Sequence, residues 1–151
     1  MEKLDNTEFD SLCPDDTYEF AKKLGEQVSA GDVICLIGDL GVGKTLFSQG
    51  FAKGLGVEEY VNSPTFTIVQ EYEGKDERHL TLYHFDVYRI EDSYEMDEVG
   101  FTDMIYGDGV SLIEWADLIE DILPDTYTKV TICKDLEKGF DYRKITVEVI
   151  R

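Results

Sequence analysis

Residues 38–45, GDLGVGKT, place three glycines, a lysine and a threonine at the spacing G-x-x-x-x-G-K-[ST]. Glycine lets a backbone approach phosphates closely and adopt positive φ angles, so that N–H groups can wrap a phosphate chain. Lys44 is expected to reach the β- and γ-phosphates of a nucleotide, and the Thr45 hydroxyl is expected to ligate Mg²⁺. The residues expected to bind the nucleotide are Asp39, Leu40, Gly41, Val42, Gly43, Lys44, Thr45 and Leu46.

A phosphate loop must join a buried strand to the N-terminus of a helix, where free N–H groups and the positive dipole end face an anion. Residues 32–37 form a short apolar run after Gly31, which predicts a buried strand. After the loop, apolar residues and glycines recur at helical spacing until Gly56, which is expected to stop the helix. The members of this face are Leu46, Phe47, Gly50, Phe51, Gly54 and Leu55. Both flanks therefore agree with a phosphate-binding loop.

Two carboxylates follow apolar segments further along the chain. Asp86, in LYHFDVYR, ends one such segment and is the candidate second Mg²⁺ ligand; alternatively, it accepts hydrogen bonds from nearby backbone N–H groups. Glu114 ends the apolar run 110–113 and either orients or activates an attacking water or caps a helix that begins near Ala116. Residue spacing alone leaves both pairs of alternatives open.

Three further positions have weaker signals. In Ser63-Pro64-Thr65-Phe66, Thr65 either brings its hydroxyl to the γ-phosphate and the metal, as switch segments do, or belongs to an ordinary turn. Arg89 either counters phosphate charge or pairs with a nearby acid. His84 is expected to be a packed strand residue, because the chain has only two histidines and neither suggests a metal site.

Composition limits the class of protein. A chain of 151 residues with 42% hydrophobic residues predicts one globular domain over residues 1–151. The net charge of −19, from 14 basic and 33 acidic residues, repels nucleic acid, so direct nucleic-acid binding by this chain alone is not expected. The same charge suits either plain solubility or docking onto a more basic protein.

Location is also constrained by composition. No stretch approaches the roughly 20 apolar residues of a membrane span, and the N-terminal MEKLDNTEFD lacks the apolar run of a secretory signal. Three cysteines without a CxxC pair predict reduced thiols in the cytoplasm.

The remaining patterns predict an α/β fold: a P-loop NTPase-like mixed sheet with a parallel core, antiparallel additions and helices on both faces. Residues 7–12 are expected to form an edge strand, and 91–108 to be irregular or weakly helical. Asp16 and Glu19 predict a capping box for a helix with an apolar face. That face comprises Phe20, Ala21, Leu24 and Val28. The other expected elements are a hairpin of strands 65–72 and 79–86, a helix over 116–123 stopped by Pro124, and closing strands 129–133 and 144–150.

Four segments in this order, GDLGVGKT, SPTF, HFDVYR and GVSLIEWAD, resemble the TsaE family, also called YjeE. These are bacterial P-loop ATPases of tRNA threonylcarbamoyladenosine synthesis. The similarity runs from Asp16 to Leu118, about two-thirds of the chain. Val42 departs from the alanine usual in the family, but the backbone plays the binding role there, so binding is expected to survive.

The resemblance implies a site that agrees with the residues singled out above. It implies that Lys44 contacts phosphates, that Thr45 and Asp86 hold Mg²⁺, and that Thr65 belongs to a switch segment. The family is similar in fold as well, with a P-loop domain and a mixed sheet.

The resemblance also implies roles at both ends of the matched region. Glu114 and Trp115 would belong to a functional EW element, which favours a catalytic Glu114. Asp16 and Thr17 lie where the adenine-side segment begins, so Thr17 is counted among the nucleotide-binding residues. The implied partners are the TsaB and TsaD proteins, which transfer threonylcarbamoyl to tRNA, while the weak ATPase resets their complex between turnovers.

Three other functions compete with this one. A small-molecule kinase would bring a lid with several arginines, and the chain has four arginines, none near another. A GTP switch would need a guanine-reading NKxD element, which the sequence lacks. A nucleotide-sensing adaptor that binds ATP without needing hydrolysis differs from a partner-dependent ATPase only in that requirement.

Overall fold

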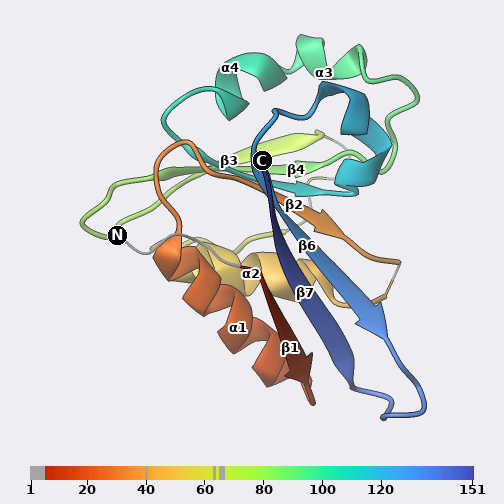
Figure 1. Cartoon of the computed structure of the whole chain (residues 1–151). Coiled ribbons are helices and arrows are strands. Elements are labelled where there is room, and N and C mark those ends of the chain that lie inside the picture. The colour runs from red at the N-terminus through yellow and green to blue at the C-terminus, as the bar shows by residue number, and fades with distance from the viewer. Residues whose placement is uncertain (1–5, 40, 63, 65–66) are drawn as a thin grey trace.

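Seven strands form a single mixed sheet in the computed structural model, in the order β1-β7-β6-β2-β5-β4-β3 (Figure 1). The structure describes residues 6–39, 41–62, 64 and 67–151. The strands are β1 (Thr7–Ser11), β2 (Val33–Ile37), β3 (Val69–Glu73), β4 (Thr81–Asp86), β5 (Val110–Glu114), β6 (Tyr127–Lys134) and β7 (Arg143–Ile150). The helices are α1 (Pro14–Gln27), α2 (Lys44–Gly54), α3 (Glu95–Glu98), α4 (Phe101–Ile105) and the 3₁₀ helix η1 (Ala116–Ile122).

The centre of the sheet is parallel and its margins are antiparallel. Strand β2 pairs in parallel with β5 on one side and β6 on the other, and β4 continues the parallel core beside β5. Strands β3, β7 and β1 add antiparallel neighbours at the two margins. The expected α/β class, with a parallel core and antiparallel additions, is confirmed, as are the β3–β4 hairpin and the closing β6–β7 pair.

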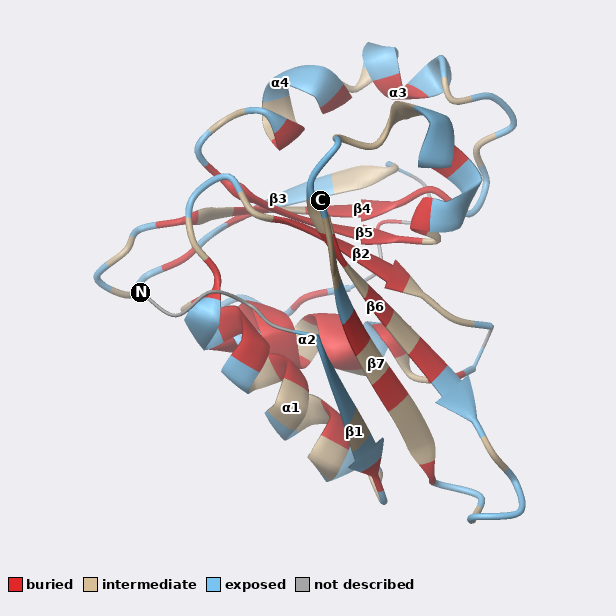
Figure 2. Cartoon of the chain, viewed as in Figure 1, coloured by how far each residue is buried: buried red, intermediate tan, exposed pale blue. Residues whose placement is uncertain are grey.

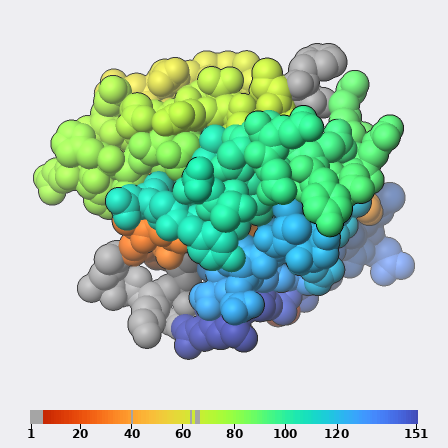
Figure 3. All heavy atoms as spheres, turned by 90° about the horizontal axis from the view of Figure 1, so that it is seen from above, coloured from red at the N-terminus to blue at the C-terminus, as the bar shows by residue number. Residues whose placement is uncertain are grey.

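Helices cover both faces of the sheet, as predicted. Helices α1 and α2 lie on one face over a core that includes Leu24, Phe47 and Phe51. On the other face, α3, α4 and η1 cover a second hydrophobic cluster that includes Phe85 and Phe101. Their rings pack edge to face with their centroids 5.4 Å apart. Figure 2 shows the buried residues gathered on the central strands and on the sheet-facing sides of the helices. Figure 3 views the molecule from the side of this second layer, whose green to blue residues lie at the centre of the visible surface.

Helices α1 and α2 pack unusually closely because glycines line their contact. A Cβ at Gly54 would lie 1.9 Å from the Lys22 carbonyl oxygen, and one at Gly50 would lie 2.4 Å from that of Tyr18. Both distances are too short for any side chain. The glycines expected on the inner face of α2 therefore allow the approach of α1.

Arg78, in the turn of the β3–β4 hairpin, joins both helices to the sheet. Its Nη1 donates to the carbonyl oxygens of Gly25, Glu26 and Val28 at 3.0–3.2 Å, and its Nη2 donates to that of Gly54 at 3.0 Å. The guanidinium thus meets the C-terminal ends of α1 and α2, where unpaired carbonyls and the negative dipole end favour a cation. Asp76 holds it in place through an ion pair of 2.6 Å.

Helix α1 begins three residues earlier than predicted. Its N-cap is Cys13 and Pro14 occupies the first turn, where a missing N–H costs nothing. Asp16 is therefore not the N-cap of a capping box: it lies inside the first turn, and its Oδ2 accepts a hydrogen bond of 3.0 Å from the Leu12 N–H. The predicted apolar face is confirmed, because Ala21, Leu24 and Val28 are buried.

Two other boundaries differ from the predictions. Strand β3 begins at Val69, since Ile68 turns through a φ of 69° that a strand cannot contain. The short helix expected over 116–123 is the 3₁₀ helix η1 (Ala116–Ile122), interrupted at Ile119. Short 3₁₀ segments are frequent as connectors, and this one lies in the connection between β5 and β6.

Two expectations from composition concern membranes and cysteines. In the described part of the chain, no helix has both the length and the apolar character to cross a membrane. Cys13, Cys35 and Cys133 are all free thiols, and burial raises the pKa of Cys35 to about 12.

We expect Arg78→Ala to destabilise the fold by about 2–3 kcal/mol, because carbonyls at two helix ends lose a charged donor. Denaturant unfolding would measure this change. Arg78→Lys should lose most of the same free energy, since an ammonium cannot reproduce the fork. Lys75→Ala, which removes an equal charge from an exposed neighbour in the same turn, is the control. Equal stability of the Arg78→Ala and Lys75→Ala proteins would contradict the assigned role.

Candidate functional site

The parallel strands bring the predicted site residues to one edge of the sheet. Glu114, the last residue of β5, is in register with Leu36 of β2 and with Asp86 of β4. The chain leaves β2 after Ile37 and enters the phosphate loop at the same edge. Residues from three distant parts of the sequence thus meet, as expected where parallel strands end together.

The described part of the loop has the backbone of an anion-binding turn. Gly41 and Gly43 have φ angles of 80° and 106°, which favour glycine, and Gly43 is the N-cap of α2. The first hydrogen bond of the helix runs from the Phe47 N–H to the Gly43 carbonyl at 2.9 Å. The N–H groups before it belong to the loop and to the positive end of α2, which suit phosphate oxygens. Leu40 lies outside the described residues.

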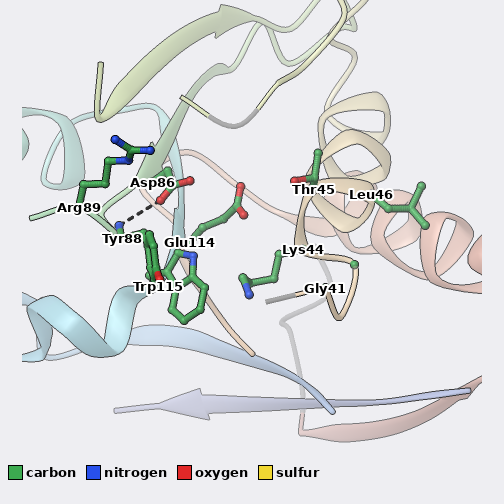
Figure 4. A pocket seen from close by; sticks show the side chains of 10 residues that line it. Gly41, Lys44, Thr45, Leu46, Asp86, Tyr88, Arg89, Glu114 and Trp115 are labelled. Carbon is green, nitrogen blue, oxygen red and sulfur yellow. Dashed lines mark hydrogen bonds between the residues drawn. The ribbon is translucent and has the colours of Figure 1, made fainter. Parts of the chain in front are cut away.

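A cavity of about 610 Å³ opens over this helix end and the strand edge (Figure 4). This volume is in the range of small-molecule sites. The residues that line it are Gly41, Gly43, Lys44, Thr45, Leu46, Asp86, Tyr88, Arg89, Glu114 and Trp115. The structure therefore assembles most of the predicted nucleotide-binding, metal-binding and catalytic residues around one space.

Lys44 is the buried cation of this cavity. Its Nζ donates to the carbonyl oxygens of Gly38 at 2.5 Å and Asp39 at 2.7 Å, and lies 4.0 Å above the Trp115 ring. Burial lowers the pKa of Lys44, while the nearby carboxylates, Glu114 foremost, act in the opposite direction. An anionic ligand in the cavity would further favour the charged form.

Asp86 accepts a backbone hydrogen bond, one of the two alternatives that its position left open, and its role as a Mg²⁺ ligand stays a prediction. Its Oδ1 accepts a hydrogen bond of 3.0 Å from the Tyr88 N–H, and its carboxylate also lines the cavity (Figure 4). Burial raises the pKa of Asp86; the Tyr88 N–H lowers it and the charge of Glu114 raises it. A cation beside the carboxylate would therefore stabilise its ionised form.

The donor set fits Mg²⁺ held jointly with a nucleotide. Asp86 and Thr45 present a carboxylate and a hydroxyl to the same cavity. Among the described residues, no three or more His, Cys, Asp or Glu side chains form a metal cluster. Mg²⁺ in phosphoryl-transfer sites needs only one or two protein ligands, because substrate phosphates and waters complete its octahedron. The residues present thus match a metal that arrives with its nucleotide.

Glu114 faces the cavity from a buried position. Its Oε2 lies 2.6 Å from His84 Nε2 and 3.3 Å from Ser48 Oγ. The alternative role as a helix cap is not found, because the N-cap of η1 is Trp115 and no side chain caps that helix. His84 is the packed strand residue that was expected, but its contact with Glu114 was not foreseen, since residue spacing does not reveal pairing between β4 and β5.

Trp115 completes the floor of the cavity in a strained conformation. Its φ of 63° is uncommon for a residue other than glycine and is typical of functional sites. The turn places its ring against Tyr88, with centroids 4.6 Å apart, and under the Lys44 ammonium. Trp115, which only the resemblance singled out, therefore adds an aromatic surface beside the Glu114 carboxylate.

Among the described residues, three predicted site residues do not line the cavity: Asp39 and Val42 of the loop, and Thr17. Thr17 is buried in α1, and its Oγ1 lies 2.6 Å from Ser11 Oγ; among the described residues it is not one that lines the cavity. Its contact with a nucleotide stays a prediction. Thr65 lies outside the described residues, as do Ser63 and Phe66, so the switch segment also stays a prediction.

Arg143, at the start of β7, supports the loop from outside the cavity and was missed by sequence reasoning. Its Nε donates to the Val42 carbonyl oxygen at 2.9 Å, while its Nη1 donates to those of Tyr142 and Phe140 at 2.7 and 3.0 Å. The Val42 side chain is buried in the core. No sequence signal marks Arg143, because its hydrogen-bond partners in the described part of the chain are backbone carbonyls.

Arg143→Ala is expected to weaken nucleotide binding about 10-fold, the loss typical of one hydrogen bond to a charged donor, because the loop is no longer held at Val42. Titration with ADP or ATP would measure the dissociation constant. Lys144→Ala is the matched control, since it removes the neighbouring charge, whose ion-pair partner in the described residues is Glu8 at 3.6 Å. Lys44→Ala gives the reference for a lost phosphate contact. Wild-type affinity in Arg143→Ala would contradict the role.

Comparison with known proteins agrees with this geometry. The family model "Threonylcarbamoyl adenosine biosynthesis protein TsaE" matches residues 13–145. The tRNA threonylcarbamoyladenosine biosynthesis protein TsaE of Bacillus subtilis is 45% identical over 140 residues, which cover 93% of this chain and 84% of that protein. Its counterpart in Treponema pallidum is 39% identical over 137 residues, which cover 91% and 96% of the two chains.

A solved structure supports the same relationship. The crystal structure of Bacillus subtilis YdiB is similar to this chain with a TM-score of 0.77 and 36% sequence identity, and the match covers all of this chain and 90% of the other. The mixed sheet, the loop between β2 and α2, and the extent of the family match lead to one conclusion. The chain belongs to the TsaE family.

Proposed function

We propose that this chain binds ATP with Mg²⁺, hydrolyses it weakly by itself, and supports N6-threonylcarbamoyladenosine modification of tRNA together with the TsaB and TsaD proteins. One observation carries the proposal. The glycine loop, the N-terminus of α2, Lys44, Asp86 and Glu114 converge on one cavity of about 610 Å³. The family membership adds the pathway, which the names of the relatives state.

Each group would have a distinct task in ATP binding. The backbone of residues 39–46 would hold the phosphates, with Lys44 supplying the charge-assisted donor. Thr45 and Asp86 would hold Mg²⁺, which neutralises charge that develops on the β- and γ-phosphate oxygens. Thr17 would contact the adenine side from the start of α1.

Hydrolysis would need a group that positions water. Glu114 has a fixed carboxylate at the cavity and would orient or activate the attacking water. Thr65, from the switch segment, would approach the γ-phosphate when ATP is bound. A site with few such groups suits weak hydrolysis in the isolated protein, since phosphoryl transfer depends on positioning and charge stabilisation.

The charge of the protein bears on its partners. Between Arg89 and Lys129 every charged residue is acidic, and this segment includes the helices that cover one face of the sheet. Such a surface would repel tRNA directly and suits contact with more basic proteins. We therefore assign tRNA binding to the partners and place the chain in the cytoplasm, where tRNA is modified and thiols stay reduced.

The two alternatives use the same cavity. A small-molecule kinase would transfer the γ-phosphate to an acceptor, and a nucleotide-sensing adaptor would use ATP binding without hydrolysis. A kinase lid would bring several arginines, and Arg89 is the only arginine among the described residues that line the cavity. The adaptor has no observation of its own in its favour, because it differs from the ATPase only in not needing hydrolysis. Phosphorylated product from a metabolite panel would favour the kinase.

Slow ATP hydrolysis by the purified chain should rise when TsaB, TsaD and tRNA from the same organism are added, because the missing positioning groups would come from the complex. Phosphate release measured with and without each component tests this. A Glu114→Gln protein that still sustains multiple rounds of tRNA modification would favour the adaptor. A rate unaffected by the partners would reject the coupled ATPase.

Asp86→Asn should lower Mg²⁺-dependent hydrolysis about 10- to 100-fold while nucleotide affinity without Mg²⁺ changes little. The asparagine keeps an acceptor for the Tyr88 N–H and removes only the charge, so it separates the metal role from the structural one. Hydrolysis and nucleotide titration, each with Mg²⁺ or with chelator, would show the difference. Equal losses of affinity in both conditions would contradict a metal-side role.

A further inference from the structure

His84 is a buried polar residue whose place in the fold is not explained by packing alone. It lies in the middle of β4, and its side chain is 0% exposed. Its Nε2 is 2.6 Å from Glu114 Oε2, and the Glu114 side chain is only 3% exposed. The two residues are 30 positions apart in sequence and meet because β4 and β5 run side by side in parallel.

The surroundings of the ring indicate which nitrogen carries its proton. His84 Nδ1 is buried and has no hydrogen-bond partner among the described residues. A proton on Nδ1 would therefore leave a buried N–H donor unsatisfied, which costs more than a buried lone pair on an acceptor nitrogen. The neutral ring with its proton on Nε2 avoids this cost. In that tautomer Nε2–H donates to the Glu114 carboxylate.

Ser48 is a weaker donor to the same carboxylate. Its hydroxyl lies 3.3 Å from Glu114 Oε2 but 2.9 Å from the Lys44 carbonyl oxygen, one helical turn earlier in α2. A hydroxyl has only one proton, and the shorter contact is the one inside the helix. Of these two side chains, the imidazole therefore makes the stronger contact with Glu114.

We propose that His84 is a positioning residue for Glu114: its Nε2–H fixes one carboxylate oxygen and so sets the orientation of the carboxylate toward the cavity. The inference rests on the proposed function, in which Glu114 orients or activates the attacking water. It assigns a reason to a buried polar residue that lies between Leu82 and the cavity-lining Asp86 on one face of β4. Leu82, two residues earlier on the same face, belongs to the hydrophobic core.

A role in folding alone does not explain why this position holds a histidine. The ring leaves one buried nitrogen unpartnered in the described structure, and an apolar side chain of similar volume would avoid that penalty. The hydrogen bond to Glu114 offsets only part of the free-energy cost of burying the unpartnered nitrogen. A positioning role accounts for retaining the polar ring, because the orientation of a reacting group affects rate more than stability.

The direct test of the hydrogen bond is NMR of the protein labelled with ¹⁵N-histidine, without nucleotide. The chain has only two histidines, and exposed His79 in the hairpin turn is the internal reference. His84→Gln assigns the signals. We expect His84 to have its proton on Nε2, and Glu114→Gln to shift the Nε2 resonance while leaving that of His79 unchanged. A proton on Nδ1, or no response to Glu114→Gln, would overturn the proposal whether or not the protein hydrolyses ATP.

The kinetic test compares His84→Leu with His84→Gln. We expect His84→Leu to lower kcat about 10- to 100-fold with little change in nucleotide affinity, the range typical of residues that orient a reacting or ligating group. His84→Gln places an amide donor near the position of Nε2 and should recover most of the rate. In a Glu114→Gln background, His84→Leu should cause no further loss.

Ser111→Ala is the matched control. Ser111 is buried on β5, and its hydroxyl also has no hydrogen-bond partner in the described residues; Ser111 pairs with Tyr83, next to His84. It should keep the wild-type rate. Equal rates in His84→Leu and wild type, or parallel losses of rate, nucleotide affinity and thermal stability in both His84 variants, would overturn the proposal. Absence of hydrolysis in the wild type would instead reject the proposed function and leave the NMR result to decide.

Discussion

Parallel pairing of β2, β5 and β4 is the constraint on which the site depends. Because these strands run in the same direction, their carboxyl ends meet at one edge, and the register sets Leu36, Glu114 and Asp86 side by side. The glycine loop leaves β2 at that edge and turns directly into α2. The helix N-terminus, the lysine and two carboxylates then share a cavity, although the sequence separates them by up to 70 positions.

Several basic residues of this acidic protein are used inside it. Backbone carbonyl oxygens accept hydrogen bonds from three of them. Lys44 and Arg143 donate to carbonyls of the phosphate loop, and Arg78 donates to carbonyls at the ends of α1 and α2. A guanidinium or ammonium that satisfies carbonyls in this way leaves less positive charge on the surface. The outer layer of α3, α4 and η1 lies between Arg89 and Lys129, where every charged residue is acidic.

Strain and buried polarity concentrate near the cavity. Trp115, immediately after Glu114, has a positive φ, and so does Ile68. The Ile68 carbonyl oxygen accepts a hydrogen bond of 2.8 Å from the Asp86 N–H. His84 adds a buried nitrogen without a described partner. Each feature costs folding free energy, and such costs are typical of sites where side chains are held for binding or chemistry.

Local signals were sufficient for most of the elements. Apolar periodicity predicted β2, α2, β5 and the closing strands, and the glycine loop identified itself because phosphate binding requires that spacing. The predicted starts of two elements were wrong. Helix α1 begins at Pro14, so Asp16 is not its N-cap, and β3 begins only after Ile68, whose φ is positive. In both cases one or two residues moved the first residue of the element away from its predicted position.

By itself, the sequence determined the fold class, the phosphate loop, and the identities of Lys44, Thr45, Asp86 and Glu114 as candidates, because each depends on residue type within a short window. Only the tertiary structure decided the contacts of His84, Arg78 and Arg143. Histidine meets Glu114 through strand register, and both arginines bind carbonyl oxygens that every residue possesses. Such partners have no signature in sequence, since the fold alone determines which distant atoms become neighbours.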